Sequence, residues 1–280
     1  MKINFTKMHG LGNDYVYVNG FKENIENPNE FSKFISDRHF GIGSDGLVII
    51  LPSKKADFKM RMFNADGSEG KMCGNASRCI GKYVYENGLT DKTNISLETL
   101  AGIKYLTLNV TDNIVKSVKV DMGKTIITPH DIPVISDLPK FVNEPIEIDN
   151  QTYYVTCVSM GNPHAIIFCD NVDEIDLEKI GPKFESHPLF PDRINTEFVQ
   201  IINSTTVKMR VWERGSGETL ACGTGACATA VACTLNGHFK QGDNIVVMLR
   251  GGNLSITYTE NQTVFMEGSA TKVFDGIIEY

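Results

Sequence analysis

Apolar and polar residues alternate along two segments of the chain in the way that half-buried β-strands require. Phe58–Phe63 and Val207–Trp212 both follow this two-residue period. A turn-forming stretch follows each segment, Asp66–Ser68 in the first case and Gly215–Gly217 in the second. The pattern therefore predicts the same strand and turn twice, at two distant places in the chain.

A helix is predicted after each turn. A cysteine and a glycine come first, and then a residue able to cap a helix, Asn75 or Thr224. The first helix is expected to end at Asn87-Gly88 and the second at Asn236-Gly237. Glycine readily takes the left-handed conformation that ends helices. Ala226–Leu235 is rich in Ala, Val and Cys on nearly all sides, which predicts a buried helix.

These two segments belong to an internal repeat with an offset of 149 residues. The identities fall at glycines, caps and cysteines, where backbone geometry and chemistry are most demanding. They are Gly12-Asn13 with Gly161-Asn162, Lys59–Arg61 with Lys208–Arg210, Glu69 with Glu218, Cys73-Gly74 with Cys222-Gly223, and Asn87-Gly88 with Asn236-Gly237. The repeat predicts a duplicated chain.

Predicted strands outnumber predicted helices in both halves, which indicates an α+β fold. Two further short helices are expected, Glu30–Asp37 and Val172–Ile180. The domains are predicted to comprise residues 1–125 and 126–269, with residues 270–280 joining the first. The other expected strands are Tyr15–Val18, Leu47–Leu51, Ile103–Val110, Ile114–Asp121, Tyr153–Val158, Ala165–Cys169, Phe198–Ile202, Asn244–Leu249 and Leu254–Tyr258.

Composition narrows the possible partners. The chain has 280 residues, 41% of them apolar and 22% charged, with a formal charge of −7. No basic cluster is present, which argues against nucleic acid and anionic membranes as partners, because both bind through dense Lys and Arg. The sequence shows neither an apolar run of about 20 residues nor the apolar core of a signal peptide. We therefore expect a cytoplasmic protein with a small-molecule substrate.

The seven cysteines are expected to be thiols. Their number is odd, none form a C-x-x-C pair, and the histidines do not lie at zinc-ligand intervals from them, so no metal site is predicted. Five cysteines are expected to act as small buried hydrophobic residues: Cys79, Cys157, Cys169, Cys227 and Cys233.

The remaining two, Cys73 and Cys222, suggest catalysis. A cysteine at a helix N-terminus feels the positive end of the helix dipole, which can lower its pKa from about 8.5 toward neutrality. Two such cysteines in equivalent places of a duplicated chain suggest one sulfur on each face of a substrate. A stereocentre is inverted without redox chemistry if one sulfur removes a proton and the other donates one. The helix amides would bind the α-carboxylate as its charge grows.

Other interpretations remain open. Either Cys-Gly pair taken alone is better explained as a tight turn. A cysteine hydrolase with His164 as its base is possible, although it leaves the second cysteine unexplained. Asn13 and Asn162 could be turn formers, and Glu213 with Arg214 an exposed ion pair. A protein that binds amino acids without catalysis is a further alternative.

Longer motifs give the chain a resemblance to a known family. It resembles diaminopimelate epimerase over essentially its full length. The matching runs are Lys7–Asp14, Asn64–Glu69, Cys73–Asn75, Ser159–His164, Glu213–Thr219, Ala221–Gly225 and Phe274–Gly276.

The resemblance implies conversion of LL-2,6-diaminoheptanedioate to the meso form, in lysine and cell-wall synthesis, by a homodimeric isomerase that needs no pyridoxal phosphate or other cofactor. It implies two similar domains, each a β-barrel-like wrap of strands around a central helix. Cys73 and Cys222 match the acid/base pair, while His164 and Glu213 match residues that tune the cysteines. The residues implied to hold substrate amines and the distal carboxylate are Asn13, Asn64, Asn162, Asn195, Glu213 and Arg214. Those implied to bind the reacting carboxylate are Gly74, Asn75, Gly223 and Thr224.

Two positions depart from the family pattern. Ala76 stands where the family often has glycine, and Gly46 where some members have glutamine. Because related enzymes racemise other amino acids, a racemase of, for example, histidine is the alternative. The presence of Asn64, Asn162 and Arg214, with Asn195, favours the diacid.

Overall fold

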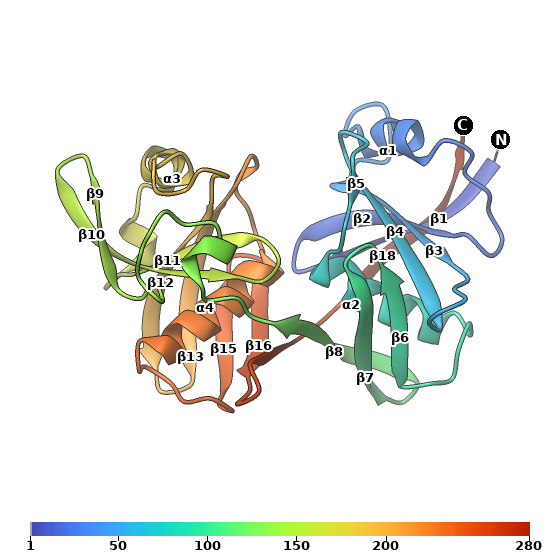
Figure 1. The fold of residues 1–280 in the computed structure, drawn as a ribbon. Coiled ribbons are helices and arrows are strands. Elements are labelled where there is room, and N and C mark those ends of the chain that lie inside the picture. The colour runs from blue at the N-terminus through green and yellow to red at the C-terminus, as the bar shows by residue number, and fades with distance from the viewer. Residues whose placement is uncertain (1) are drawn as a thin grey trace. The chain divides into compact units, whose positions relative to one another are not determined.

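The chain divides into two compact units in the computed structural model, which describes residues 2–280. Unit 1 contains the chain up to Asp121 together with Glu267–Tyr280, and unit 2 contains Met122–Met266. The C-terminal strand therefore belongs with the N-terminal one, and Figure 1 shows the red strand β18 beside the blue strand β1.

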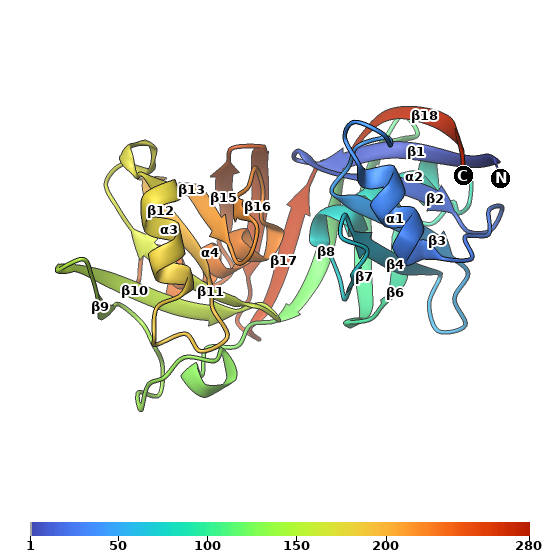
Figure 2. The same cartoon turned by 90° about the horizontal axis from the view of Figure 1, so that it is seen from above.

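Unit 1 is a strand-rich layer with two helices. Its strands pair in the order β18-β1-β2-β3-β4-β6-β7-β8, with β2/β3 and β4/β6 parallel and the other pairs antiparallel. Helix α1 packs on β3 and β4, and Figure 2 shows it lying across these strands. The elements are β1 (Lys2–Gly10), β2 (Asn13–Asn19), α1 (Pro28–Ser36), β3 (Gly46–Leu51), β4 (Phe58–Asn64), β5 (Glu69–Gly70), α2 (Gly74–Glu86), β6 (Asn94–Thr99), β7 (Gly102–Thr111), β8 (Ile114–Lys124) and β18 (Thr271–Glu279).

Unit 2 repeats this topology. Its strands pair in the order β9-β10-β11-β12-β13-β15-β16, with β11/β12 and β13/β15 parallel. The elements are η1 (Pro129–Asp131), β9 (Glu144–Ile148), β10 (Gln151–Ser159), β11 (Pro163–Phe168), η2 (Val172–Glu174), α3 (Leu177–Glu185), β12 (Asn195–Asn203), β13 (Thr206–Glu213), β14 (Gly217–Glu218), α4 (Gly223–Leu235), β15 (Asn244–Leu249), β16 (Gly252–Tyr258) and β17 (Thr263–Gly268).

The two units correspond residue by residue at the repeat offset. Adding 149 to the bounds of β1 gives those of β10, and the same shift carries α1 onto α3 and α2 onto α4. The duplicated sequence therefore encodes a duplicated arrangement of strands and helices. This bears out the predicted fold class, a sheet-dominated α+β fold in two parts.

Helix α4 occupies the interior of unit 2. It contacts β10, β11, β12, β15 and β16, and every residue from Ala226 to Cys233 is fully buried. Burying apolar area at roughly 25 cal/mol per Å² makes such a central helix a main source of stability. The prediction of a buried helix without a polar face is confirmed.

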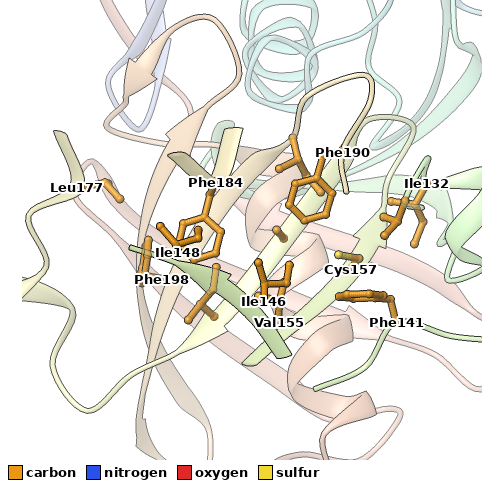
Figure 3. Packing of buried hydrophobic residues seen from close by; sticks show 14 of the residues in the cluster. Ile132, Phe141, Ile146, Ile148, Val155, Cys157, Leu177, Phe184, Phe190 and Phe198 are labelled. Atoms are coloured by element: carbon orange, nitrogen blue, oxygen red, sulfur yellow. The ribbon is translucent and has the colours of Figure 1, made fainter. Parts of the chain in front are cut away.

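A second apolar cluster fills unit 2 on the side of α3. Figure 3 shows Phe184 and Phe198 beside Ile146, Ile148 and Val155, which come from α3, β12, β9 and β10. The Phe184 and Phe198 rings meet edge to face at 5.7 Å. The cluster fixes α3 and the β9–β10 hairpin onto the sheet.

Several predicted elements were misplaced. The helix expected at Val172–Ile180 is a short 3-10 turn followed by α3, because Asn171 caps the former and Asp176 the latter. Helix α3 also continues through Pro182 to Glu185, five residues beyond the predicted end at Ile180. The long strands β1 and β18 were not predicted, because their pairing joins opposite ends of the chain. Cys169 is only half-buried, unlike the other four cysteines expected in the core.

Residues 2–280 contain no helix with the length and apolar character needed to cross a membrane.

Candidate active site

Both cysteines of interest are themselves the N-cap residues of helices. Cys73 precedes α2 and Cys222 precedes α4, each with an extended backbone. Each sulfur accepts a hydrogen bond from the amide three residues on, Ala76 N at 3.5 Å and Gly225 N at 3.3 Å. The expectation that Asn75 and Thr224 would cap these helices was wrong by two residues, because the sulfur takes the role that a side-chain oxygen usually has.

A matched ion pair holds the loop before each cysteine. Arg61 forks onto Glu69 at 2.7 and 2.9 Å, and Arg210 forks onto Glu218 at 2.8 and 3.0 Å. The acidic partners lie on the short strands β5 and β14, which pair with β4 and β13. Bidentate pairs fix orientation as well as distance. They therefore set where the chain leaves the sheet and enters the helix.

In unit 1 the sulfur of Cys73 faces an amide oxygen. Asn13 Oδ1 lies 3.6 Å from Cys73 Sγ and also accepts from Asn75 Nδ2 at 3.3 Å. The other end of the Asn13 amide donates to Asp45 Oδ2 at 2.8 Å. Arg38 and the backbone N–H of Asp14 hold that carboxylate in turn. Because Asp45 can only accept when ionised, the oxygen of Asn13 must be the end that faces the sulfur.

In unit 2 the sulfur of Cys222 faces a hydroxyl. Thr224 Oγ1 lies 3.5 Å from Cys222 Sγ and accepts from Asn162 Nδ2 at 3.2 Å. Asn162 Oδ1 lies 3.2 Å from His164 Nε2, and His164 Nδ1 lies 2.6 Å from Glu197 Oε1. A connected series of polar side chains therefore runs from the interior of the unit to the sulfur.

Burial and negative charge dominate the ionisation of Cys222. Burial raises the pKa of its thiol well above the ordinary value, and the carboxylates of Glu213 and Glu197 raise it further. Hydrogen bonds from Thr224 and Gly225 act in the opposite direction but are outweighed. The expectation that the helix terminus would bring this cysteine toward a neutral pKa was therefore wrong. The raised pKa favours the protonated form of Cys222, which is the form that can donate a proton.

Glu213 is the last residue of β13, and Arg214 begins the loop that follows. Glu213 Oε1 accepts from Thr219 at 2.5 Å, and Arg214 donates to the Asp192 carbonyl at 2.7 Å. Asn195 is buried and bonded at both ends, donating to the Pro163 carbonyl and accepting from the Arg214 backbone. Asn195 therefore fixes the loop that carries Arg214.

The remaining predicted residues lie beside the two helix starts or at a turn. Gly74 and Gly223 open α2 and α4, where the first amides of a helix have no intrahelical acceptor. Asn75 is buried, and within residues 2–280 its Oδ1 has no hydrogen-bond partner. Asn64 is exposed at the end of β4, and its side chain donates to Ser68.

The backbone explains the glycine at position 46. A Cβ added to Gly46 would lie 1.9 Å from the Phe63 carbonyl oxygen. In this chain the position therefore leaves no space for a side chain.

Two residues of these networks were missed from the sequence. Glu197 is the third residue of β12 and directly precedes the strand predicted from Phe198 to Ile202, and it is completely buried. Asp45 lies in a glycine-rich turn. The usable signal for Glu197 was a carboxylate beside a strongly apolar stretch, since carboxylates are almost never fully buried unless paired.

A cavity in unit 2 lies away from the predicted site residues. Its volume is about 640 Å³, and it lies between the β9–β10 hairpin and α3, lined among others by Tyr153, Phe168 and Lys183. None of the predicted site residues lines it. Across residues 2–280, no group of three or more His, Cys, Asp and Glu side chains is arranged to hold a metal ion.

Known proteins match this chain over nearly its whole length. The family model described as diaminopimelate epimerase matches residues 5–128 and 156–273. A protein of Acetivibrio thermocellus named diaminopimelate epimerase is 63% identical over 98% of both chains. Proteins of the same name from Methanococcus maripaludis and Bacillus cytotoxicus are 59% and 50% identical, covering 98% and 100% of this chain and 99% and 98% of their own.

Solved structures show the same fold at low sequence identity. A PhzF-family phenazine biosynthesis protein of Bacillus anthracis matches with a TM-score of 0.74 at 17% identity, covering 100% of both chains. A hydroxyproline epimerase of Agrobacterium vitis matches with a TM-score of 0.70 at 14% identity, covering 99% of this chain and 91% of its own.

Proposed function

We propose that this chain, which belongs to the diaminopimelate epimerase family, interconverts LL- and meso-2,6-diaminoheptanedioate by moving the proton on one α-carbon. The chain is an isomerase, and this activity supplies lysine and peptidoglycan synthesis. Support comes from relatives of that name that are 50–63% identical over nearly the full chain. The observation that carries the mechanism is the pair of cysteines capping α2 and α4 in equivalent positions of a duplicated fold.

We propose that Cys73 and Cys222 are the acid/base pair. One sulfur, as thiolate, takes the α-proton, and the other, as thiol, gives a proton to the opposite face of the same carbon. In the reverse direction the roles exchange. The steps balance without oxidant or cofactor, since one C–H bond breaks, another forms, and the sulfurs end with their protonation states reversed. General acid/base catalysis of this kind contributes roughly 10²–10⁴-fold.

The carbanion needs stabilisation that the helix starts can supply. As the proton leaves, charge moves onto the α-carboxylate, and preorganised N–H donors stabilise that charge most effectively. We propose that Gly74, Asn75, Gly223 and Thr224 bind this carboxylate through their backbone amides. The positive ends of the α2 and α4 dipoles act in the same direction.

The distal end of the substrate calls for groups that recognise an ammonium and a second carboxylate. We propose that Arg214 takes the carboxylate, because guanidinium matches it with two parallel hydrogen bonds. Asn amides can serve either charge. The residues proposed to hold the amines and the distal carboxylate are Asn13, Asn64, Asn162, Asn195, Glu213 and Arg214.

We propose that His164 and Glu213 tune the cysteines. The carboxylate of Glu213 raises the pKa of Cys222 and so strengthens its sulfur as a base once it has lost its proton. His164 acts through Asn162 and Thr224. We further propose that each compact unit is one epimerase domain, and that the enzyme is a cytoplasmic homodimer, as the family resemblance implies.

The test is a substrate panel with chiral separation of the products. The LL diacid, the meso diacid and the enantiomers of histidine are incubated separately with the pure protein. We expect the two diacids to interconvert and histidine to remain unchanged. Racemisation of histidine faster than epimerisation of the diacid would overturn the substrate assignment, and an unchanged diacid would overturn the function.

A further inference from the structure

The interior of unit 2 contains a histidine–carboxylate pair at full burial. His164 and Glu197 have no exposed surface, and His164 Nδ1 lies 2.6 Å from Glu197 Oε1. Within residues 2–280, Glu197 Oε2 has no hydrogen-bond partner. Burying a carboxyl group with one oxygen unsatisfied costs free energy, and such a pair is weak evidence for a purely stabilising role.

We infer that Glu197 is a positioning residue that, through His164 and Asn162, directs the Thr224 hydroxyl toward the sulfur of Cys222. The inference rests on the proposed function, because it assigns Glu197 a part in the proton transfer by Cys222. In this role Glu197 acts through His164 and Asn162 and takes no proton from the substrate.

The order of donors and acceptors follows from the amide of Asn162, which has one accepting end and one donating end. When His164 Nε2 carries a proton, it donates to Asn162 Oδ1, and Asn162 Nδ2 then donates to Thr224. The Thr224 hydroxyl proton is left for the sulfur 3.5 Å away. When Nε2 lacks a proton, the amide turns over, the Thr224 proton goes to Asn162 Oδ1, and the sulfur loses this donor.

Glu197 decides between these arrangements by its contact with Nδ1. The pair shares one proton, on the carboxyl oxygen or on Nδ1, and with either placement Nε2 keeps its own. Burial raises the pKa of the Glu197 carboxyl, which acts in favour of this shared proton. The other ionisable groups that face the pair are Glu213 on β13, Cys157 on β10 and Cys222.

The backbone makes room for this carboxyl group. A Cβ on Gly225 would lie 2.5 Å from Glu197 Oε1 and 3.2 Å from the sulfur of Cys222. The equivalent positions in unit 1 hold Val48 and Ala76, an apolar pair without such a contact. The glycine and the carboxylate therefore occur together, on the side of the molecule where the hydroxyl faces the sulfur.

The consequence concerns the step in which Cys222 gives its proton to the α-carbon. The S–H bond breaks, the new C–H bond forms, and the electron pair stays on sulfur as a thiolate. A hydroxyl already directed at that sulfur stabilises the charge as it forms, without reorganisation. Hydrogen bonds to charged groups are strong enough to change such a step by about tenfold to a hundredfold.

The first test measures the ring nitrogens of His164 by long-range ¹H–¹⁵N NMR, with the signal assigned by its loss in His164→Gln. We expect Nε2 to be protonated in the wild-type protein across the pH range of activity, and in Glu197→Gln, whose amide can donate to Nδ1. In Glu197→Leu we expect a mixture of tautomers. An unprotonated Nε2 in the wild-type protein overturns the inference, whether or not the diacid is turned over.

The second test is a double-mutant cycle on kcat. We expect Glu197→Leu and Thr224→Val each to lower kcat about tenfold to a hundredfold. The double variant should be no slower than the slower single variant, because both changes remove the same hydrogen bond. Glu197→Gln and Thr224→Ser should retain most of the activity. Losses that multiply in the double variant contradict the inference, since a packing role for Glu197 would be independent of Thr224.

Discussion

The two cysteine-capped helices are built on equivalent backbones, yet the side chains around the two sulfurs differ in kind. Asn13 and Asn162 are equivalent residues, and they present opposite ends of their amides toward the cysteine side. Cys73 meets the amide oxygen, which can only accept, whereas Cys222 meets a hydroxyl, which can donate to a thiolate.

The two amides differ in orientation because different residues hold their other ends. Asp45 orients the Asn13 amide, and the His164–Glu197 pair orients that of Asn162. Duplication therefore preserved the helix start, which the chemistry needs twice, while the supporting residues diverged. An enzyme that moves a proton from one face of a carbon to the other has no need of identical environments on the two faces.

The largest expected effect comes from removing either sulfur. Cys73→Ala and Cys222→Ala should each lower epimerisation of the diacid by about 10²–10⁴-fold, because each removes one of the two proton-transfer groups. Initial rates of LL and meso interconversion measure this. Cys169→Ala, in unit 2 but outside the networks, is the control and should stay close to wild type. Normal turnover by Cys73→Ala or Cys222→Ala would contradict the proposal that both sulfurs transfer a proton.

A second test exchanges glycine and alanine at equivalent helix positions. Gly225→Ala should destabilise the protein by about 1–3 kcal/mol, since its Cβ would overlap Glu197 and approach Cys222. Ala76→Gly should cost at most about 1 kcal/mol, the ordinary difference in helix propensity. Urea unfolding gives both values. Equal losses would mean that the space beside Glu197 is not specific to unit 2.

Acid should weaken unit 1 before unit 2. Lys92 and Ser96 lower the pKa of Asp57 from its ordinary value of 3.8 to about 2, and position 206, its equivalent in unit 2, is a threonine. A lowered pKa stabilises the fold above the ordinary value, and this stabilisation is lost as the pH falls from about 4 to about 2. Allowing for solvent contact, the loss is about 1 kcal/mol.

Hydrogen exchange followed by mass spectrometry at decreasing pH would measure this difference. Peptides of β4 and β6 should lose protection at a higher pH than those of β13 and β15. In Asp57→Asn the pH dependence of β4 and β6 should flatten. Simultaneous loss of protection in both units would contradict the assignment.

The smallest expected effect comes from weakening the two bidentate ion pairs, Arg61 with Glu69 and Arg210 with Glu218. Arg210 also donates to the carbonyls of Val172 and Ile175, whereas Arg61 lies over the ring of Phe63 and is more exposed. Arg210→Lys should therefore cost about 1 kcal/mol and Arg61→Lys only a few tenths. Thermal unfolding of the two variants measures the difference. A larger cost for Arg61→Lys would show that the stacked ring matters more than the carbonyl contacts.

Local patterns predicted the repeated parts of the fold well. The strand, turn, cysteine and helix could be recognised because each has a periodic or positional signal, and because each occurs twice. The all-round apolar composition of Ala226–Leu235 correctly indicated a central helix. The use of cysteine as N-cap escaped prediction, since that position usually belongs to Ser, Thr, Asp or Asn.

The unpredicted features depend on contacts between distant residues. Strands β1 and β18 pair the two ends of the chain, so neither shows its partner locally. Glu197 and His164 are 33 residues apart, and only the parallel pairing of β11 with β12 brings them together. The raised pKa of Cys222 likewise comes from burial and from Glu213 and Glu197, which a helix-dipole argument does not contain.

The most direct measurement is the position of solvent deuterium after epimerisation in D₂O. If two different sulfurs act on the two faces, LL-diacid stopped at low conversion should yield meso product with one deuterium at the inverted α-carbon, while the recovered LL-diacid keeps its proton. The reverse reaction should label its own product in the same way. Deuterium in the recovered substrate at the same rate as in the product, or product without deuterium, would mean that a single group carries the proton and would contradict the account.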